Sequence, residues 1–215
     1  MEGINQNPLF YDLQFTMLTQ AEGVNLQQWL ADYAVRRYGS DEACLWEALR
    51  LLRMSCYAAK TSDSERGSIL CARPHWWIDR AAPNDMIEIR YSNRMLLRAL
   101  EKLLEAKRAG KDGYAFDLCD IARQALSNHA LSLYNQAMDG FFQHNRAMFE
   151  HASASFLELL QDMDRLLATR PELRLSRWAE RAQKLGEDET MASYYREKCA
   201  GAYHALGACG GTDYI

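Results

Sequence analysis

The chain has 215 residues, of which 48% are hydrophobic and 25% are charged. This composition is typical of a globular protein that buries a sizeable core, and it excludes a disordered or fibrous chain. The 25 basic residues are nearly balanced by 29 acidic ones, for a formal net charge of -4, so no basic surface for nucleic acid is expected. No apolar run approaches the roughly 20 residues that span a bilayer, and no export signal is recognisable at the N-terminus.

Hydrophobic residues recur with a period near 3.6 along almost the whole chain, which predicts an all-α protein of about six to eight helices. The first helix is expected to begin at Asn7-Pro8, with Asn as the cap and Pro in the first turn, and to end at Gly23. A second helix is expected between the cap Asn25 and Gly39. Its apolar stripe, with a polar end, is Leu26, Trp29, Leu30, Tyr33 and Arg37.

A third helix is expected in the stretch DEACLWEALRLLRMSCYAA, capped by Ser40 or Asp41. The face that it would bury is Leu45, Leu49, Leu52 and Cys56. From residue 61 to residue 84 the periodicity is lost, and this stretch holds two of the four prolines and the pair Trp76-Trp77. Because exposed tryptophans are costly in water, we predict a long loop that is ordered and docked.

Helical patterning resumes over residues 85–109 and stops at the sequence GKDG. It runs again from about residue 114 to residue 145. Two further amphipathic segments are predicted over 148–169 and 175–206, with Pro171 marking the joint between them. The last residues, GACGGTDYI, are rich in glycine and predict a non-helical end.

The six cysteines form no C-x-x-C pair and no Cys/His spacing suited to a tetrahedral metal site. We interpret most of them as small hydrophobic residues of helices, in preference to a disulfide framework. Among the five histidines, His144 and His151 could share a helix face, but neither a Glu-x-x-His nor a His-Glu-x-x-His motif occurs. The sequence therefore predicts no metal site and no cofactor.

Polar residues recur on one side of the helix predicted at FDLCDIARQAL. They are Asp117, Asp120 and Arg123 or Gln124. Such a seam is either a solvated helix face or a buried hydrogen-bond network that fixes how helices meet. The spacing alone favours neither interpretation.

Five stretches stand out by their order and separation: EGINQNPLFYDL, NLQQWLADYAVRRYG, SILCARP, FDLCDIARQALSNHALSLYNQAM and the closing DY. Together they resemble the C-terminal portion of α-N-acetylglucosaminidases, glycoside hydrolase family 89. The resemblance covers nearly the whole chain. It implies an all-α domain that packs on a (β/α)₈ barrel, preceded here by the last active-site loop and helix of that barrel. The implied division is 1–22 for the barrel remnant and 23–215 for the helical domain, truncated at its end.

The resemblance also implies the chemistry. Members of the family cleave terminal α-linked N-acetylglucosamine from glycans with retention, using two glutamates. The nucleophile belongs to a motif that matches MEGINQN here, so Glu2 is the implied nucleophile, and Met1 would be an internal residue of a longer protein. Tyr214 matches a tyrosine that lines the sugar site, although Leu206-Gly207 stands where the family has Trp-Gly. The acid/base glutamate belongs to a part of the barrel that this chain does not match.

Partners follow from the same resemblance: glycans ending in N-acetylglucosamine, and the missing N-terminal barrel of the same enzyme. The faces that would dock on the barrel lie around Phe10, Tyr11, Phe15, Trp76 and Trp77. The chain alone should be inactive and should tend to self-associate through these faces. The alternative is a non-catalytic helical interaction module derived from the family. Relatives are exported or lysosomal, but the compartment of this chain does not follow from its sequence.

Overall fold

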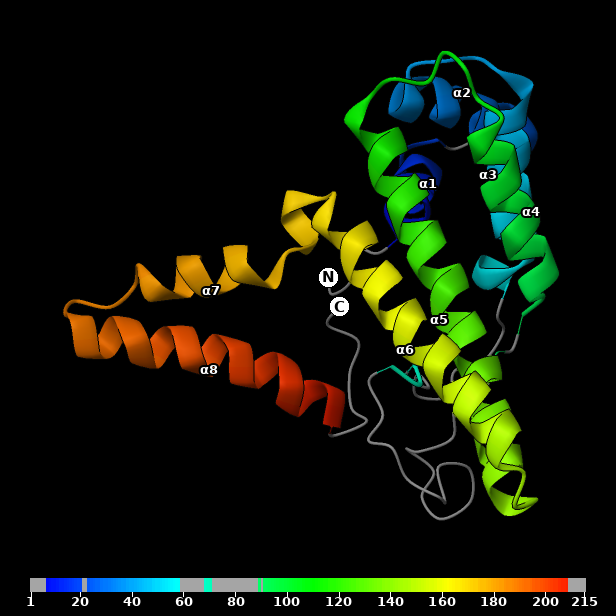
Figure 1. Cartoon of the computed structure of the whole chain (residues 1–215). Coiled ribbons are helices and arrows are strands. Elements are labelled where there is room, and N and C mark those ends of the chain that lie inside the picture. Colours follow the sequence, from blue (N-terminus) through cyan, green and yellow to red (C-terminus); the bar gives the residue numbers. More distant parts are fainter. Residues whose placement is uncertain (1–6, 21–22, 59–67, 71–88, 90, 209–215) are drawn as a thin grey trace. The chain divides into compact units, whose positions relative to one another are not determined.

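The computed structural model describes residues 7–20, 23–58, 68–70, 89 and 91–208, the last nine of these as backbone only. Within these ranges it contains eight α-helices, two 3-10 helices and no strand, so the predicted all-α class is confirmed (Figure 1). The elements are α1 (Pro8–Thr19), α2 (Leu26–Tyr38), α3 (Ala43–Met54), η1 (Cys56–Ala58), α4 (Asn93–Leu104), α5 (Asp112–Phe142), α6 (Arg146–Ala168), η2 (Pro171–Leu173), α7 (Leu175–Gln183) and α8 (Glu189–Ala208). No described helix is long and apolar enough to cross a membrane.

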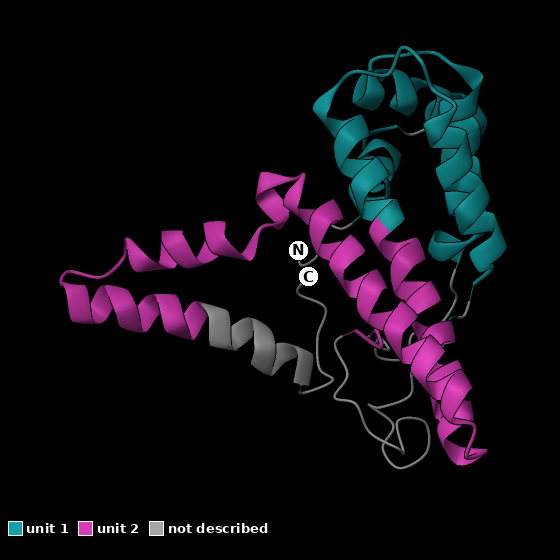
Figure 2. Cartoon of the chain, viewed as in Figure 1, with its two compact units in different colours: residues 1–62, 89–122, 213–215 teal, residues 63–88, 123–212 magenta. Residues whose placement is uncertain are grey.

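The chain divides into two compact units, each with its own packing (Figure 2). Unit 1 comprises residues 1–62, 89–122 and 213–215, and unit 2 comprises residues 63–88 and 123–212. Helix α5 contributes its first third to unit 1 and the remainder to unit 2. The boundary that the resemblance implies between residues 22 and 23 stays a prediction.

Unit 1 is built on α3, which packs against both α2 and α4. Its largest fully buried hydrophobic side chains are Tyr38, Leu45, Leu49, Leu96 and Leu103. The predicted caps are confirmed in α1 and α2: the side chain of Asn7 accepts a hydrogen bond from Phe10 N and that of Asn25 from Gln28 N. Gly39 takes the left-handed conformation at φ 78°, which lets the chain leave α2 without steric cost. Helix α1 ends at Thr19, four residues before Gly23.

The start of α3 differs from the prediction, because neither Ser40 nor Asp41 is its cap. Residue Glu42 precedes the helix, and its side chain makes no capping bond to it. Instead, the Glu42 carboxylate accepts hydrogen bonds from the backbone amides of Lys107 (2.9 Å) and Arg108 (2.8 Å). The Ser40 hydroxyl donates to the same carboxylate at 2.9 Å. Glu42 therefore ties the segment after α4 to the start of α3.

This carboxylate should make the stability of unit 1 depend on pH. The amides of Lys107 and Arg108, with the Ser40 hydroxyl, lower the pKa of Glu42 below its ordinary value. Since the folded pKa is the lower one, the stabilisation is present above the ordinary carboxyl pKa and is lost as pH falls through the folded pKa. We expect a Glu42→Gln variant to lower the urea midpoint at neutral pH and to match the unchanged chain in acid. Equal losses at both pH values would contradict this assignment.

Two helix boundaries in unit 1 also differ from the prediction. The third helix ends at Met54, so Cys56 lies in η1 and not on the buried face of α3. Helix α4 begins at Asn93, later than the predicted residue 85, with the Ser92 hydroxyl accepting from Met95 N at 3.3 Å. A serine side chain that caps a helix favours a helix start at that position. The sequence prediction overlooked Ser92 because the apolar pattern continues on both sides of it.

Unit 2 has its core where the second part of α5 meets α6 and residues 68–70. The buried members of this cluster are Ile69, Ala130, Leu133, Leu159 and Met163. The hydroxyls of Ser68 and Ser127 are hydrogen-bonded to each other beside it. The predicted joint at Pro171 is the short helix η2. The predicted segment 175–206 is in fact two helices, α7 and α8, which lie side by side as a hairpin (Figure 1).

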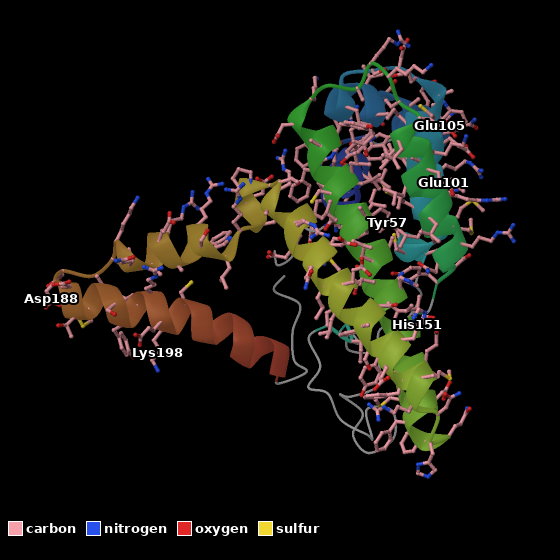
Figure 3. The ribbon with its side chains drawn as sticks, viewed as in Figure 1. Tyr57, Glu101, Glu105, His151, Asp188 and Lys198 are labelled. Atoms are coloured by element: carbon pink, nitrogen blue, oxygen red, sulfur yellow. The ribbon has the colours of Figure 1, made fainter. Side chains whose placement is uncertain are left out.

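The turn of this hairpin depends on Gly186. A Cβ built on Gly186 would overlap the backbone nitrogen of Ala192 and lie 2.5 Å from its Cα. Asp188, at the tip of the hairpin in Figure 3, accepts from Met191 N at 2.8 Å and starts α8 at this point. Because the overlap is with backbone, neither side can yield without opening the turn.

We expect Gly186→Ala to destabilise the hairpin by about 2 kcal/mol, in the range usual for overpacking. Limited proteolysis should show faster cleavage near residues 184–188. Gly110→Ala is the matched control, because a Cβ at Gly110 would meet nothing within 4 Å. Similar cleavage rates for the two variants would show that the close approach at Gly186 does not hold the turn.

Candidate functional site

The two longest sequence motifs meet in unit 1 through one ion pair. Arg37, near the end of α2, lies opposite Asp117, on the first part of α5. Arg37 Nε donates to Asp117 Oδ2 at 2.6 Å, and Arg37 Nη2 donates to Asp117 Oδ1 at 2.5 Å. The Tyr38 hydroxyl donates to Asp117 Oδ2 at 2.9 Å. A bidentate arginine–carboxylate pair of this kind fixes both distance and orientation.

The network is largely removed from solvent. The side chains of Arg37 and Asp117 are 21% and 13% exposed, and Tyr38 is fully buried. Burial raises the pKa of Tyr38, and the charge and hydrogen bond of Asp117 raise it further. Burial works to lower the pKa of Arg37, but the hydrogen bond and charge of Asp117 outweigh it and the pKa is raised. Asp117 therefore belongs to a buried hydrogen-bond network between helices, and this decides the interpretation that its spacing left open.

An open pocket of about 550 Å³ lies beside this network. Its charged lining residues are Asp12, Arg36, Arg37, Lys111 and Asp112. Arg36 Nη2 pairs with Asp12 Oδ2 at 2.8 Å, and Lys111 Nζ donates to the Arg36 carbonyl at 2.8 Å. Pro8, directly after the motif that contains Glu2, also lines the pocket. The pocket therefore lies beside the start of α1 and has charged side chains of both signs on its wall.

Both residues assigned by resemblance, Glu2 and Tyr214, lie outside the described residues, as do Trp76 and Trp77. The structure therefore does not test the roles of Glu2 and Tyr214. It does describe Asn7, the last residue of the motif, whose Oδ1 accepts from Phe10 N at 3.0 Å. The motif thus ends as the cap of α1.

Helix α1 presents an apolar face to solvent. Phe10 and Phe15, expected at a docking face, are 52% and 67% exposed, and Tyr11 is partly buried. Met17 and Leu18 extend this face and are 62% and 80% exposed. Sequence reasoning missed them, although their spacing from Phe10 was a signal that could have found them. Exposed apolar side chains gathered on one helix are typical of an interaction surface.

No group of three or more His, Cys, Asp or Glu side chains within the described part could hold a metal ion. His144 lies in the turn before α6, at φ 55°, whereas His151 is exposed on α6 (Figure 3). The two histidines therefore do not share a helix face. Cys44, Cys56, Cys119 and Cys199 are free thiols. Burial raises the pKa of Cys56 to about 11, so it is a poor nucleophile.

Comparison with known proteins gives consistent matches over most of the chain. A family profile described as the alpha-N-acetylglucosaminidase (NAGLU) C-terminal domain matches residues 29–200. The human protein named alpha-N-acetylglucosaminidase is 26% identical over 200 residues, covering 91% of this chain and 26% of its own length.

Solved structures of a family 89 glycoside hydrolase from Clostridium perfringens are also similar. The complex with 2-acetamido-1,2-dideoxynojirmycin is 29% identical with a TM-score of 0.80, and it covers 92% of this chain and 23% of that one. A variant of the clostridial protein with two Glu→Gln substitutions, in complex with its substrate GlcNAc-alpha-1,4-galactose, is 30% identical with a TM-score of 0.79 over the same shares. The chain thus spans about a quarter of the length of these relatives.

Proposed function

Because this chain belongs to the family of α-N-acetylglucosaminidase C-terminal domains, we propose that it is the C-terminal part of a retaining exo-glycosidase that removes terminal α-linked N-acetylglucosamine from glycans. The observation that carries the proposal is the likeness, over 92% of the chain, to a family 89 enzyme whose substrate complex contains GlcNAc-alpha-1,4-galactose. The helical class agrees with the C-terminal domain of these glycoside hydrolases.

The reaction needs two carboxyl groups about 5 to 5.5 Å apart, one on each side of the glycosidic bond. The Glu2 carboxylate attacks the anomeric carbon and forms a glycosyl-enzyme ester. As the bond to the leaving oxygen breaks, an acid/base glutamate of the barrel donates a proton to that oxygen. Water, deprotonated by the same glutamate, then attacks the anomeric carbon and releases Glu2. In support, the clostridial substrate complex was solved with two glutamates changed to glutamine.

The remaining residues serve the site in two ways. Tyr214 lines the sugar pocket, as its match to the family implies. The exposed face of α1 provides the surface on which the barrel packs, and this accounts for apolar side chains such as Phe15 and Leu18. The Arg37–Asp117 pair holds the helices beneath that surface together.

The test compares the 215-residue chain alone with the same chain joined to the barrel of a family 89 relative. We expect no turnover of an aryl α-N-acetylglucosaminide by the chain alone, since it lacks the acid/base group and most of the sugar-positioning residues. General acid help contributes about 10²- to 10⁴-fold, and positioning contributes more. The joined protein should be active. If the joined protein is folded but inactive, the alternative is favoured, which is a non-catalytic helical interaction module.

A further inference from the structure

Helix α1 is attached to α2 through one face of each helix, both in unit 1. Residues on these faces recur at helical spacing: Leu9, Asp12 and Thr16 on α1, and Trp29, Tyr33 and Arg36 on α2. Trp29 Nε1 donates to Thr16 Oγ1 at 3.1 Å, and Arg36 Nη2 donates to Asp12 Oδ2 at 2.8 Å. Leu9 and Tyr33 line the same small cavity beneath.

The Arg36 guanidinium is positioned by two aromatic rings of α2 as well as by Asp12. The rings of Trp29 and Tyr33 stack with centroids 5.2 Å apart, and the Arg36 guanidinium lies 5.9 Å from each centroid. On α1, the Thr16 hydroxyl donates to the Asp12 carbonyl at 2.8 Å while it accepts from the indole of Trp29. These directional contacts restrict both the rotation of α1 about its axis and its sliding along α2.

Few side chains of α1 are removed from solvent in the part of the chain that the structure describes. Leu9 is its only buried residue, and the apolar side chains of Phe10 and Leu18 face solvent. Asp12 and Arg36 are 42% and 53% exposed, so their ion pair contributes little to overall stability. Because the pair joins two helices, and α1 has a single buried residue, we expect the pair to act mainly on the orientation of α1.

We propose that Asp12 and Arg36 are positioning residues for the glycosidase reaction: their ion pair orients α1, and with it the helix start to which Glu2 is linked by a short stretch of chain. This inference rests on the proposed function of Glu2 as the nucleophile. Glu2 precedes the cap Asn7 by five residues, so chain geometry keeps their Cα atoms within about 18 Å. A misplacement of about 1 Å at a reacting group can cost on the order of 10²-fold in rate.

The experiment uses the chain joined to a family 89 barrel and an aryl α-N-acetylglucosaminide. Arg36→Met keeps an apolar stem against Trp29 and Tyr33 but removes the charge. We expect kcat to fall by about 10-fold or more with KM little changed, the pattern of an interaction that matters in the transition state. The exchanged pair Asp12→Arg with Arg36→Asp should recover part of the loss. Arg108→Met is the matched control, since it breaks an exposed pair with Asp41 elsewhere in unit 1 and should leave kcat unchanged.

A second measurement does not depend on activity. In the 215-residue chain, Arg36→Met should speed hydrogen exchange of amides in α1 and leave α3 and α4 unchanged. Unchanged exchange in α1 of the Arg36→Met variant would overturn the inference. An unchanged kcat in the joined Arg36→Met variant would also overturn it, and if Glu2→Ala inactivates the same joined protein, the proposed function would stand. Full turnover in the joined Glu2→Ala variant would instead overturn the proposed function, and this inference with it.

Discussion

Glu2→Ala should abolish nearly all turnover when the chain is joined to the barrel of a family 89 relative. Alanine offers no carboxylate to attack the anomeric carbon, so the glycosyl-enzyme ester cannot form. Loss of the nucleophile in a serine protease costs on the order of 10⁶-fold in kcat, and a loss of several orders of magnitude is expected here. The measurement is the release of the aryl group from an aryl α-N-acetylglucosaminide.

Azide separates loss of the nucleophile from loss of the fold. A small anion can occupy the space of the missing carboxylate and attack the anomeric carbon, so added azide should restore part of the activity and yield a glycosyl azide. Glu101→Ala is the matched control, because Glu101 is an exposed glutamate on α4 (Figure 3). It should retain full activity. Full activity in Glu2→Ala would show that the family match describes the fold of this chain and not a catalytic role for Glu2.

The second large effect is expected at Asp117 and concerns stability. Asp117→Ala leaves the Arg37 guanidinium largely buried with neither of its two hydrogen bonds to Asp117, and it removes the acceptor of the buried Tyr38 hydroxyl. Breaking a buried ion pair by removing one partner costs roughly 3 to 5 kcal/mol. Since both side chains retain some exposure, the lower end of this range, about 3 kcal/mol, is expected. Urea unfolding followed by circular dichroism measures the loss.

Asp41→Ala is the matched control for Asp117→Ala, because it removes one partner of an ion pair whose side chains are 76% and 68% exposed. The cost there should be at most about 1 kcal/mol. The double variant Arg37→Met with Asp117→Leu should recover part of the lost stability, since it removes the unpaired charge and keeps the volume filled. Equal costs at Asp117 and Asp41 would mean that the Arg37–Asp117 pair does not hold α2 and α5 together.

Most features that depend on neighbouring residues were predicted correctly from the sequence, and features that depend on distant residues were not. The all-α class followed from the hydrophobic period, and the caps Asn7, Asn25 and Gly39 were recognised because a cap acts on a backbone amide or carbonyl a few residues away. The ends of α3 and α4 were predicted less well. The turn at Gly186 was missed, because a single glycine is tolerated within a helical pattern and becomes decisive only when the chain folds back on Ala192.

For the site, the resemblance supplied Glu2 and Tyr214, and their roles stay predictions. By itself, the sequence determined that Arg37 and Asp117 each lie on an amphipathic helix, because helical spacing depends only on neighbouring residues. Only the tertiary structure decided that these two residues, 80 positions apart, meet in one bidentate pair, and that Asp12 and Arg36 join α1 to α2. The physical reason is that a charged residue gives the same sequence pattern whether its side chain faces water or a partner on a distant helix. Which of the two it faces depends on how the helices pack.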